Sequence, residues 1–263
     1  MNPGLNTRNF SFSSRAVVDN PFNWAYELEE LGFSGWEIVC EGKQELNDRN
    51  LAQISTILET TNLVLTVHLP FSDLNLASLN EPMWRETLRQ MKQNIKLASP
   101  FTRIAAVHPG HLSPLGMQMP DLSWQKNIEG LQQLCDYAAE YDMTIGVENM
   151  VNMDAILGRH AEEILGMIES VDRENLGLTL DVGHANTNGM VDAFLDKCLD
   201  RVVHVHLHDN NGKRDEHLPA GQGIVDWEKV VGSINGLGTR IVLEARTIQE
   251  GEASLRFLRD LVQ

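Results

Sequence analysis

The sequence alternates short apolar segments with amphipathic segments of helical periodicity, and this alternation constrains the fold more than any other feature. The segments that we expect to be strands lie at residues 10–14, 35–39, 63–68, 103–107, 144–147, 176–180, 202–207 and 240–243. The helices that we expect after them lie at residues 21–31, 47–60, 82–98, 123–140, 161–171, 191–199, 227–234 and 252–262. Strands joined by helices form parallel sheets, and about eight such units close into a (β/α)8 barrel. No linker interrupts the series, so we expect one α/β domain, residues 1–263, with the TIM-barrel fold.

Composition argues against several classes of function. The chain has 37 acidic and 21 basic residues and a formal charge of -16, which disfavours a broad basic surface for nucleic acid or anionic membranes. Cys40, Cys135 and Cys198 are scattered without a CxxC spacing, so we expect ordinary thiols in a reducing compartment. We find no apolar run of signal-peptide length and none of about 18 residues that would span a membrane. These features together favour a cytoplasmic protein.

The stretch VHVHLHDNNGKRDEHLPAGQG, residues 203–223, concentrates side chains that bind metal ions. His204, His206 and His208 alternate with apolar residues, and Asp215 and His217 follow in the next loop. Imidazoles and carboxylates are the usual ligands of divalent ions such as Zn²⁺ and Mn²⁺. A solvated, histidine-rich loop is the alternative interpretation of this stretch taken alone.

Further ligand-type side chains stand at the ends of the other expected strands. The carboxyl ends of the strands of a (β/α)8 barrel meet at one mouth, where active sites form. The residues at these ends are His68, His108, Glu148, Asp181, His184, His206 and Glu244. A lone histidine at a strand end is often structural, but no packing argument explains the whole series. We therefore expect a metal centre whose core ligands, Glu148, Asp181, His206 and Glu244, suit Zn²⁺, Mn²⁺, Co²⁺ or Mg²⁺.

The motifs HLP, VHPG, VEN, LDVGHAN, HLHDN, RDEH and LEA, in this order, resemble those of the xylose isomerase-like TIM-barrel superfamily. That superfamily contains sugar and sugar-phosphate isomerases and epimerases, and also endonuclease IV of AP endonuclease family 2. The isomerase branch implies one divalent ion on the four core ligands, with Glu148 and Glu244 moving a proton between carbons through a metal-stabilised enediolate. It also implies that His184 orients substrate oxygens. Glu37 would bind hydroxyls, unless it is a plain surface glutamate.

The resemblance to endonuclease IV implies instead a trinuclear zinc cluster that cleaves phosphodiesters. Its nine-ligand pattern is filled here, because five further residues join the four core ligands: His68, His108, His184, Asp215 and His217. The cations that we expect to contact a substrate phosphate are Lys213, Arg214 and Arg246. The sequence departs from this branch after VEN and at LDVGHANTNG, which lacks the Thr-Cys-His form. We also find no cluster of residues suited to opening a duplex.

We therefore expect a metal-dependent sugar or sugar-phosphate isomerase or epimerase that acts on a small sugar and uses one ion. An endonuclease IV-like AP endonuclease, which would bind nucleic acid through as many as three zinc ions, is the alternative. A sugar-binding barrel without turnover is a third interpretation. The long loop at residues 108–122 is expected to face the substrate or to act as a lid. A homodimer is compatible with this fold, but the sequence identifies neither the sugar nor the oligomer.

Overall fold

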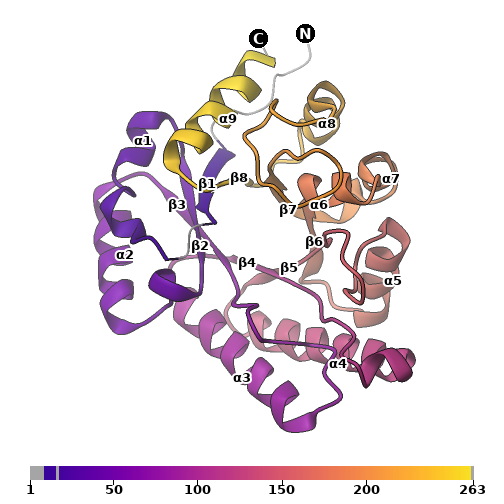
Figure 1. Ribbon diagram of the computed structural model, residues 1–263. Helices are drawn as coiled ribbons and strands as arrows, with labels where there is room; N and C mark the ends of the chain where they lie inside the picture. Colours follow the sequence, from indigo (N-terminus) through magenta and orange to yellow (C-terminus); the bar gives the residue numbers. More distant parts are fainter. Residues whose placement is uncertain (1–8, 16–17, 262–263) are drawn as a thin grey trace.

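The eight expected strands form one closed parallel barrel (Figure 1). The computed structural model describes residues 9–15 and 18–261. The strands are β1 (Phe10–Ser14), β2 (Gly35–Val39), β3 (Val64–His68), β4 (Ile104–Val107), β5 (Thr144–Glu148), β6 (Leu176–Asp181), β7 (Val202–Leu207) and β8 (Ile241–Ala245). Each strand pairs in parallel with the next, and β8 pairs with β1 to close the ring. The expected (β/α)8 TIM barrel is confirmed.

The helices surround the barrel, and several begin where the sequence provides a cap. They are α1 (Glu27–Leu31), α2 (Asp48–Thr60), α3 (Glu81–Ala98), α4 (Pro120–Ala139), α5 (Ala161–Val171), α6 (Val182–Thr187), α7 (Val191–Lys197), α8 (Trp227–Ile234) and α9 (Ile248–Leu261). The side chains of Asn47, Asn80 and Asp226 accept backbone N–H bonds in the first turns of α2, α3 and α8. Within the described residues, every helix is too short or too polar to cross a membrane.

Three elements differ from the expected ones. The expected helix at residues 21–31 is split, because a 3-10 turn at Pro21–Asn23 precedes α1. The sequence does not predict α6, whose residues show no apolar periodicity. This helix forms because the Asp181 side chain, at the end of β6, accepts a hydrogen bond from the backbone N–H of His184. The last helix begins at Ile248, four residues before the expected residue 252.

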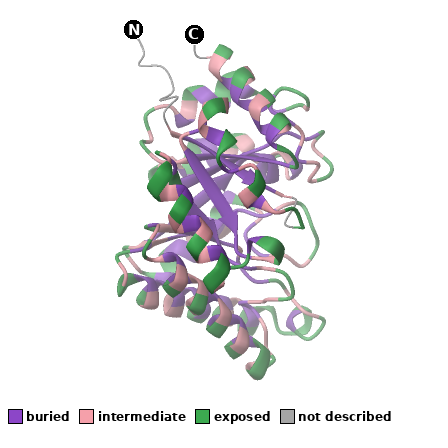
Figure 2. Cartoon of the chain, turned by 90° about the vertical axis from the view of Figure 1, so that its left-hand side faces the viewer, coloured by how far each residue is buried: buried purple, intermediate pink, exposed green. Residues whose placement is uncertain are grey.

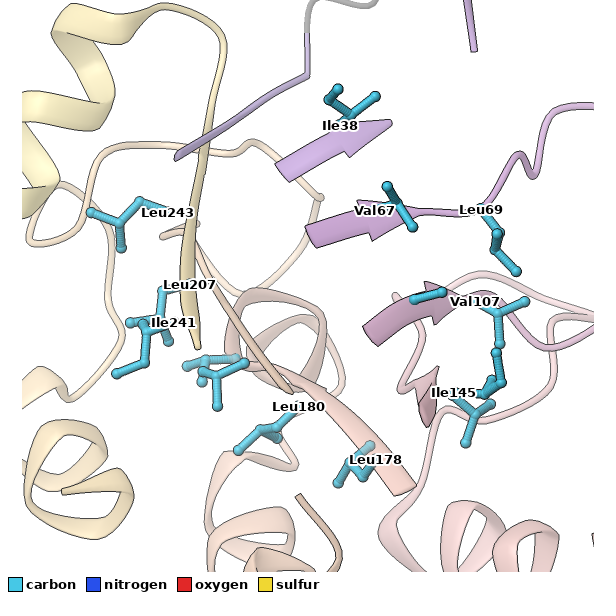
Figure 3. Close-up of a cluster of buried hydrophobic side chains, with 14 of the residues drawn as sticks. Ile38, Val67, Leu69, Val107, Ile145, Leu178, Leu180, Leu207, Ile241 and Leu243 are labelled. Atoms are coloured by element: carbon cyan, nitrogen blue, oxygen red, sulfur yellow. The ribbon is translucent and has the colours of Figure 1, made fainter. Parts of the chain in front are cut away.

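The large apolar side chains of the strands point outward to the helices. Ile38, Val67, Ile145, Leu207 and Leu243 belong to the buried cluster that lies between strands and helices (Figure 3). Figure 2 shows the resulting layers, with buried strands inside helices whose outer faces are exposed. Because side chains alternate along a strand, the residues between these apolar ones face the barrel interior. They are small or polar in most strands, whereas branched apolar side chains usually fill such a barrel.

An irregularity in β7 fixes the direction of its histidines. The register between β6 and β7 shifts by one residue, which inserts Val203 as a bulge. Gly177 on the neighbouring strand β6 leaves the necessary room, since a Cβ there would lie 2.3 Å from Val203 Cγ1. Beyond the bulge, His206 stands opposite Asp181 in the ladder. The shifted register therefore aligns a carboxylate and an imidazole at the mouth.

Candidate metal centre

The carboxyl ends of β3 to β8 bring all nine sequence-predicted ligands to one mouth. Their ligand atoms form overlapping groups, and within each group all ligand atoms lie within 4.8 Å of one another. The groups are His68, His108 and Glu148; Glu148, Asp181 and His184; Asp181, His208 and Glu244; and His184, His208, Asp215 and His217. A further group, formed by Glu37, His204 and His206, lies at the same end. Far-separated segments thus converge as the fold requires.

Glu148, Asp181, His206 and Glu244 form the centre of this arrangement. The Nδ1 atom of His206 lies 3.4 Å from Glu148 Oε1, 3.4 Å from Glu244 Oε1 and 4.0 Å from Asp181 Oδ2. The four side chains are buried, and His206 Nδ1 and Asp181 Oδ2 find no hydrogen-bond partner among the described residues. Buried polar atoms without partners are costly, and adjacent carboxylates repel one another. A divalent cation would relieve both costs, although these four residues do not form one of the close groups described above. The single-ion site on them stays a prediction.

His68 and His108 flank Glu148 on one side. Their Nε2 atoms lie 3.0 and 3.3 Å, respectively, from Glu148 Oε2. The ring of Phe71 stacks on His108 with a centroid distance of 4.5 Å and so fixes the plane of that imidazole. These residues offer two nitrogens and a shared carboxylate to a second ion.

His184, His208, Asp215 and His217 form a group on the other side. Asp215 lies 3.5 Å from both His184 Nε2 and His208 Nε2, and 3.0 Å from His217 Nε2. The rings of His208 and His217 are stacked, with their centroids 3.8 Å apart. A Cβ on Gly183 would lie 2.0 Å from His208 Cε1, so only glycine leaves room for this imidazole. These residues form a second group of donor atoms on this side of the mouth.

Glu37 lies beneath these ligands and is fully buried. Its carboxylate accepts a 2.8 Å hydrogen bond from Thr66 Oγ1 and makes a 2.6 Å hydrogen bond with His204 Nε2. The other carboxylate oxygen lies 3.0 Å from His206 Nε2. The surface position, one of the two alternatives for Glu37, is wrong because the side chain is buried beside His206, and its role in binding hydroxyls stays a prediction. A proton on Nε2 leaves the Nδ1 lone pair of His206 directed at the three carboxylates.

Two other buried polar residues hold the ligands in place. Asn149 pairs with the backbone of Asp181, donating to its carbonyl and accepting from its N–H, both at 2.8 Å. Asp209 anchors the loop that carries Asp215 and His217. Its carboxylate accepts hydrogen bonds from the backbone N–H groups of Asn210, Gly221 and Val225 and from the indole of Trp227. Neither residue is a sequence-predicted site residue.

Two of the expected substrate-binding cations do not line the main cleft. Lys213 and Arg246 are exposed and do not line the main cleft, and Arg246 Nη2 donates instead to the backbone carbonyl of Glu216. Arg15, which follows β1, does line it together with His184 and Asp215. Sequence analysis missed Arg15 because β1 is weakly patterned. The alternation of the three histidines around β7, in contrast, predicts that the side chains of His204 and His208 lie on the same face of the strand as that of His206.

Neighbouring charges in the mouth shift the pKa values of its carboxylates and histidines in opposite directions. Burial tends to raise the pKa of Glu148, but His206 and His108 hold that pKa well below its ordinary value. Burial tends to lower the pKa of His206, but Glu37, Glu148 and Glu244 raise it well above its ordinary value. Burial lowers the pKa of His217 to about 4, which keeps this ring neutral and able to bind an ion. The mouth thus holds protons that an ion would displace.

A cleft of about 850 Å³ opens from the mouth. Its inner end is lined by Arg15, His108, His184 and Asp215. The first half of the expected substrate-facing loop, from His108 to Leu115, contributes to the wall. The second half does not act as a free loop, because it contains a 3-10 turn and the start of α4 at Pro120.

The family model of the xylose isomerase-like TIM barrel matches residues 25–261. The chain belongs to this family. It is 33% identical to the uncharacterized protein MJ1311 of Methanocaldococcus jannaschii, over 97% of this chain and 89% of that protein. It is 26% identical to the fructoselysine 3-epimerase of Shigella flexneri, over 80% of this chain and 77% of that protein. The crystal structure of a D-tagatose 3-epimerase-like protein superposes with a TM-score of 0.91 and 32% identity, over 96% of each chain.

The xylose isomerase-like family thus includes relatives of this chain that are named as sugar epimerases. The site described above lies at the mouth where barrels of this kind carry out their chemistry. An enzyme of the isomerase or epimerase type is therefore the class that its homologues indicate.

Proposed function

We propose that this protein is a divalent-metal-dependent isomerase or epimerase that acts on a sugar or sugar phosphate by proton transfer through an enediolate. The observation that carries the proposal is the placement of Glu148 and Glu244, from β5 and β8, each 3.4 Å from His206 Nδ1. Two carboxylates on different strands can remove a proton from a carbon and return one from another direction. The relatives named as sugar epimerases support the same class.

Each residue of the mouth then has a distinct task. A divalent ion held by Glu148, Asp181, His206 and Glu244 would polarise the substrate carbonyl and a neighbouring hydroxyl. One glutamate takes the proton from the carbon next to the carbonyl, and the other returns a proton. His184, whose Nδ1 lies 3.2 Å from Glu148 Oε1, orients the substrate oxygens. Arg15 supplies a positive charge at the inner end of the cleft for an oxygen or a phosphate.

The test is hydrogen exchange at the carbon next to the carbonyl. Protein loaded with Mn²⁺, Co²⁺ or Zn²⁺ is incubated with ketoses and ketose phosphates in D₂O, and proton NMR follows the loss of the C–H signal. We expect exchange that depends on the ion and stops when a chelator removes it. Absence of exchange with every ketose, together with nicking of abasic duplex DNA, would overturn the proposal.

An endonuclease IV-like phosphodiesterase is the second candidate, and the presence of all nine ligands in one mouth favours it. The scarcity of positive charge in the cleft argues against it. Arginine and lysine supply most phosphate contacts to nucleic acids, but among the described residues that line the cleft Arg15 is the only one of these two types. Metal analysis separates the candidates: about one ion per chain with exchange supports the isomerase, and about three zinc ions with DNA nicking support the nuclease. Tight sugar binding without exchange would indicate a sugar-binding barrel.

A further inference from the structure

The cleft at the mouth has two chemically different ends. Its inner end presents Arg15 and three of the nine ligands, His108, His184 and Asp215. The rest of the lining includes polar residues such as Asp73 and His111 and a set of apolar side chains, here called the apolar arm: Leu74, Met83, Leu115, Met150, Met153 and Ile156. The whole cleft measures about 850 Å³, in the upper part of the range of about 300–1000 Å³ for sites that hold drug-sized ligands. A sugar bound beside His108, His184 and Asp215 would contact only part of this lining. The arm is therefore surplus to what an unsubstituted sugar needs.

Two of the polar side chains that line the cleft beside the arm, Asn75 and Thr87, are already engaged by the protein. The Asn75 amide donates to the carbonyl of His111 and accepts from the N–H groups of His111 and Ala77. Thr87 Oγ1 donates to the carbonyl of Met83 and accepts from the Asn75 N–H. A sugar hydroxyl placed in the arm would lose its water and gain few hydrogen bonds, which is costly. The arm thus disfavours a second sugar ring and favours an apolar group.

The walls of the arm are built in advance. A Cβ on Gly110 would lie 2.2 Å from the backbone nitrogen of Ala77, so the β3–α3 and β4–α4 loops are in close contact there. His111 and Ile156 form an isolated antiparallel bridge that ties the β4–α4 loop to the β5–α5 loop. A ligand group entering the arm would therefore order little of the chain and would keep most of its binding free energy.

The rim of the arm exposes apolar side chains. Met83 is 48% exposed, Leu115 51% and Met153 54%, although all three line the cleft. Large apolar side chains gathered at the edge of a cleft commonly mark a binding surface. Methionine adapts its shape to varied apolar groups, which suits a linear alkyl chain or an aromatic ring of the substrate.

We propose that the substrate is a ketose that carries an apolar alkyl or aryl substituent. The sugar oxygens lie at the inner end, and the substituent extends along the arm toward Met83 and Met153. This inference rests on the proposed sugar isomerase or epimerase function and adds the class of sugar on which the enzyme acts. Free hexoses bind weakly because they leave the arm unfilled.

The first test is a series of ligands that differ only in the length of the substituent. Calorimetry on the Mn²⁺-loaded protein measures the binding of D-fructose and of its 1-O-methyl, 1-O-butyl and 1-O-hexyl ethers. Affinity is expected to rise about fourfold for each methylene that the arm buries completely. An affinity that does not change with chain length would overturn the inference.

A pair of substitutions tests whether the arm is the cause. The double variant Met83→Gln, Met153→Gln changes two exposed positions that line the arm, so folding is preserved. It is expected to lower the affinity for the hexyl ether at least tenfold and to leave that for fructose unchanged. The matched control is Met117→Gln, because Met117 is 57% exposed and lies outside the cleft lining. Equal binding by the double variant and the control would also overturn the inference.

Exchange in D₂O, measured with the same ligands, separates the two proposals. Exchange that is equally efficient for all ligands would support the proposed reaction and contradict the apolar substituent. Binding that depends on chain length without any exchange would support the arm and contradict the reaction. If no ligand binds or exchanges, both proposals are wrong.

Discussion

The two ends of the barrel carry clefts of similar size but of opposite chemistry. The mouth cleft measures about 850 Å³, and the base cleft, at the amino ends of the strands, about 740 Å³. Three histidines and two carboxylates are among the residues that line the former. The described residues that line the latter include neither type, and the lining consists largely of apolar residues, threonines and two arginines. The same eight strands thus build a cleft rich in histidines and carboxylates at one end and a cleft without them at the other.

The difference shows where this chain accepts a cost in stability. Buried ionisable groups oppose folding unless they are paired or bind an ion. At the base, the hydroxyl of Thr102 donates a hydrogen bond to the carbonyl of Ile104, and the hydroxyl of Thr239 donates one to the carbonyl of Val203. At the mouth, His206 Nδ1 and Asp181 Oδ2 find no such partner among the described residues. Unsatisfied groups concentrated at one end indicate a function there.

The largest effect is expected from the carboxylates of the mouth. Glu148→Gln and Glu244→Gln each remove a group proposed to transfer a proton, so proton exchange should fall about 10²–10⁴-fold. Single-turnover exchange in D₂O at saturating Mn²⁺ measures it. The matched control is Glu140→Gln, an exposed glutamate at the end of α4, which should change nothing. Full activity in either mouth variant would show that the replaced glutamate transfers no proton. The mouth and the base of the barrel would then differ in charge but not in catalysis.

Glu37→Gln is expected to have the next largest effect, on metal affinity. The variant keeps the shape of the buried side chain but removes the charge that faces His206 Nε2 at 3.0 Å. Loss of such a supporting group typically weakens metal binding about 10–100-fold. Calorimetric titration with Mn²⁺ or Zn²⁺ measures the change, and Glu140→Gln again serves as the control. Unchanged affinity would mean that Glu37 only neutralises the neighbouring histidines.

A smaller effect is expected from pH. Burial lowers the pKa of His206 and His184, but neighbouring carboxylates raise both well above the ordinary value. These rings therefore keep their protons at pH values where a free imidazole loses them, and an ion must displace the protons. Metal affinity should fall about tenfold per pH unit for each displaced proton as the pH drops below the raised pKa values. Titrations in buffers of different ionisation enthalpy count the released protons, and a count of zero would contradict the prediction.

The smallest effect on the site is expected from the base. In Gly177→Ala the new Cβ would lie 2.3 Å from Val203 Cγ1 and 2.8 Å from the carbonyl of Arg201. Overpacking of this kind lowers the free energy of unfolding by about 1–3 kcal/mol, which urea denaturation of the metal-free protein measures. The control, Gly166→Ala, has nothing within 4 Å of the new Cβ and should be neutral or stabilising. Gly177 leaves room for the β7 bulge that aligns His206, so a loss of metal affinity in the folded variant larger than that of Glu37→Gln would contradict this ranking.

Much of this arrangement is predictable from the sequence because the signals are periodic. Alternating apolar residues locate the strands, and the barrel then brings their ends together, so the meeting of these side chains at one mouth could be predicted. The set of nine ligands came from the resemblance to endonuclease IV and stays a prediction. The split of the expected helix at residues 21–31 could not be predicted, because Asn20 and Pro21 suit the start of a 3-10 turn as well as that of a helix. The position of Glu37 depends on the inward direction of its side chain, which a five-residue strand alone does not fix.

Arg15 and the apolar arm show a different limit of prediction. Both depend on which loops pack together, as in the contact of Gly110 with Ala77, and such contacts leave no periodic pattern. The number and identity of the ions stay predictions for the same reason, since the donor atoms suit more than one occupancy.

The wrapping of the β7–α8 loop around Asp209 has a consequence for inherited or engineered variation. Three backbone donors of this loop and the indole of Trp227, the first residue of α8, converge on this single carboxylate. Its loss would therefore release the segment that carries Asp215 and His217 while the barrel wall stays intact. A substitution of Asp209 would therefore impair activity as a substitution in the active centre does, although Asp209 itself contacts none of the reacting groups. The tip of the same loop, at residues 211–214, is largely exposed. Its length or sequence can therefore vary without disturbing the hydrogen bonds to Asp209.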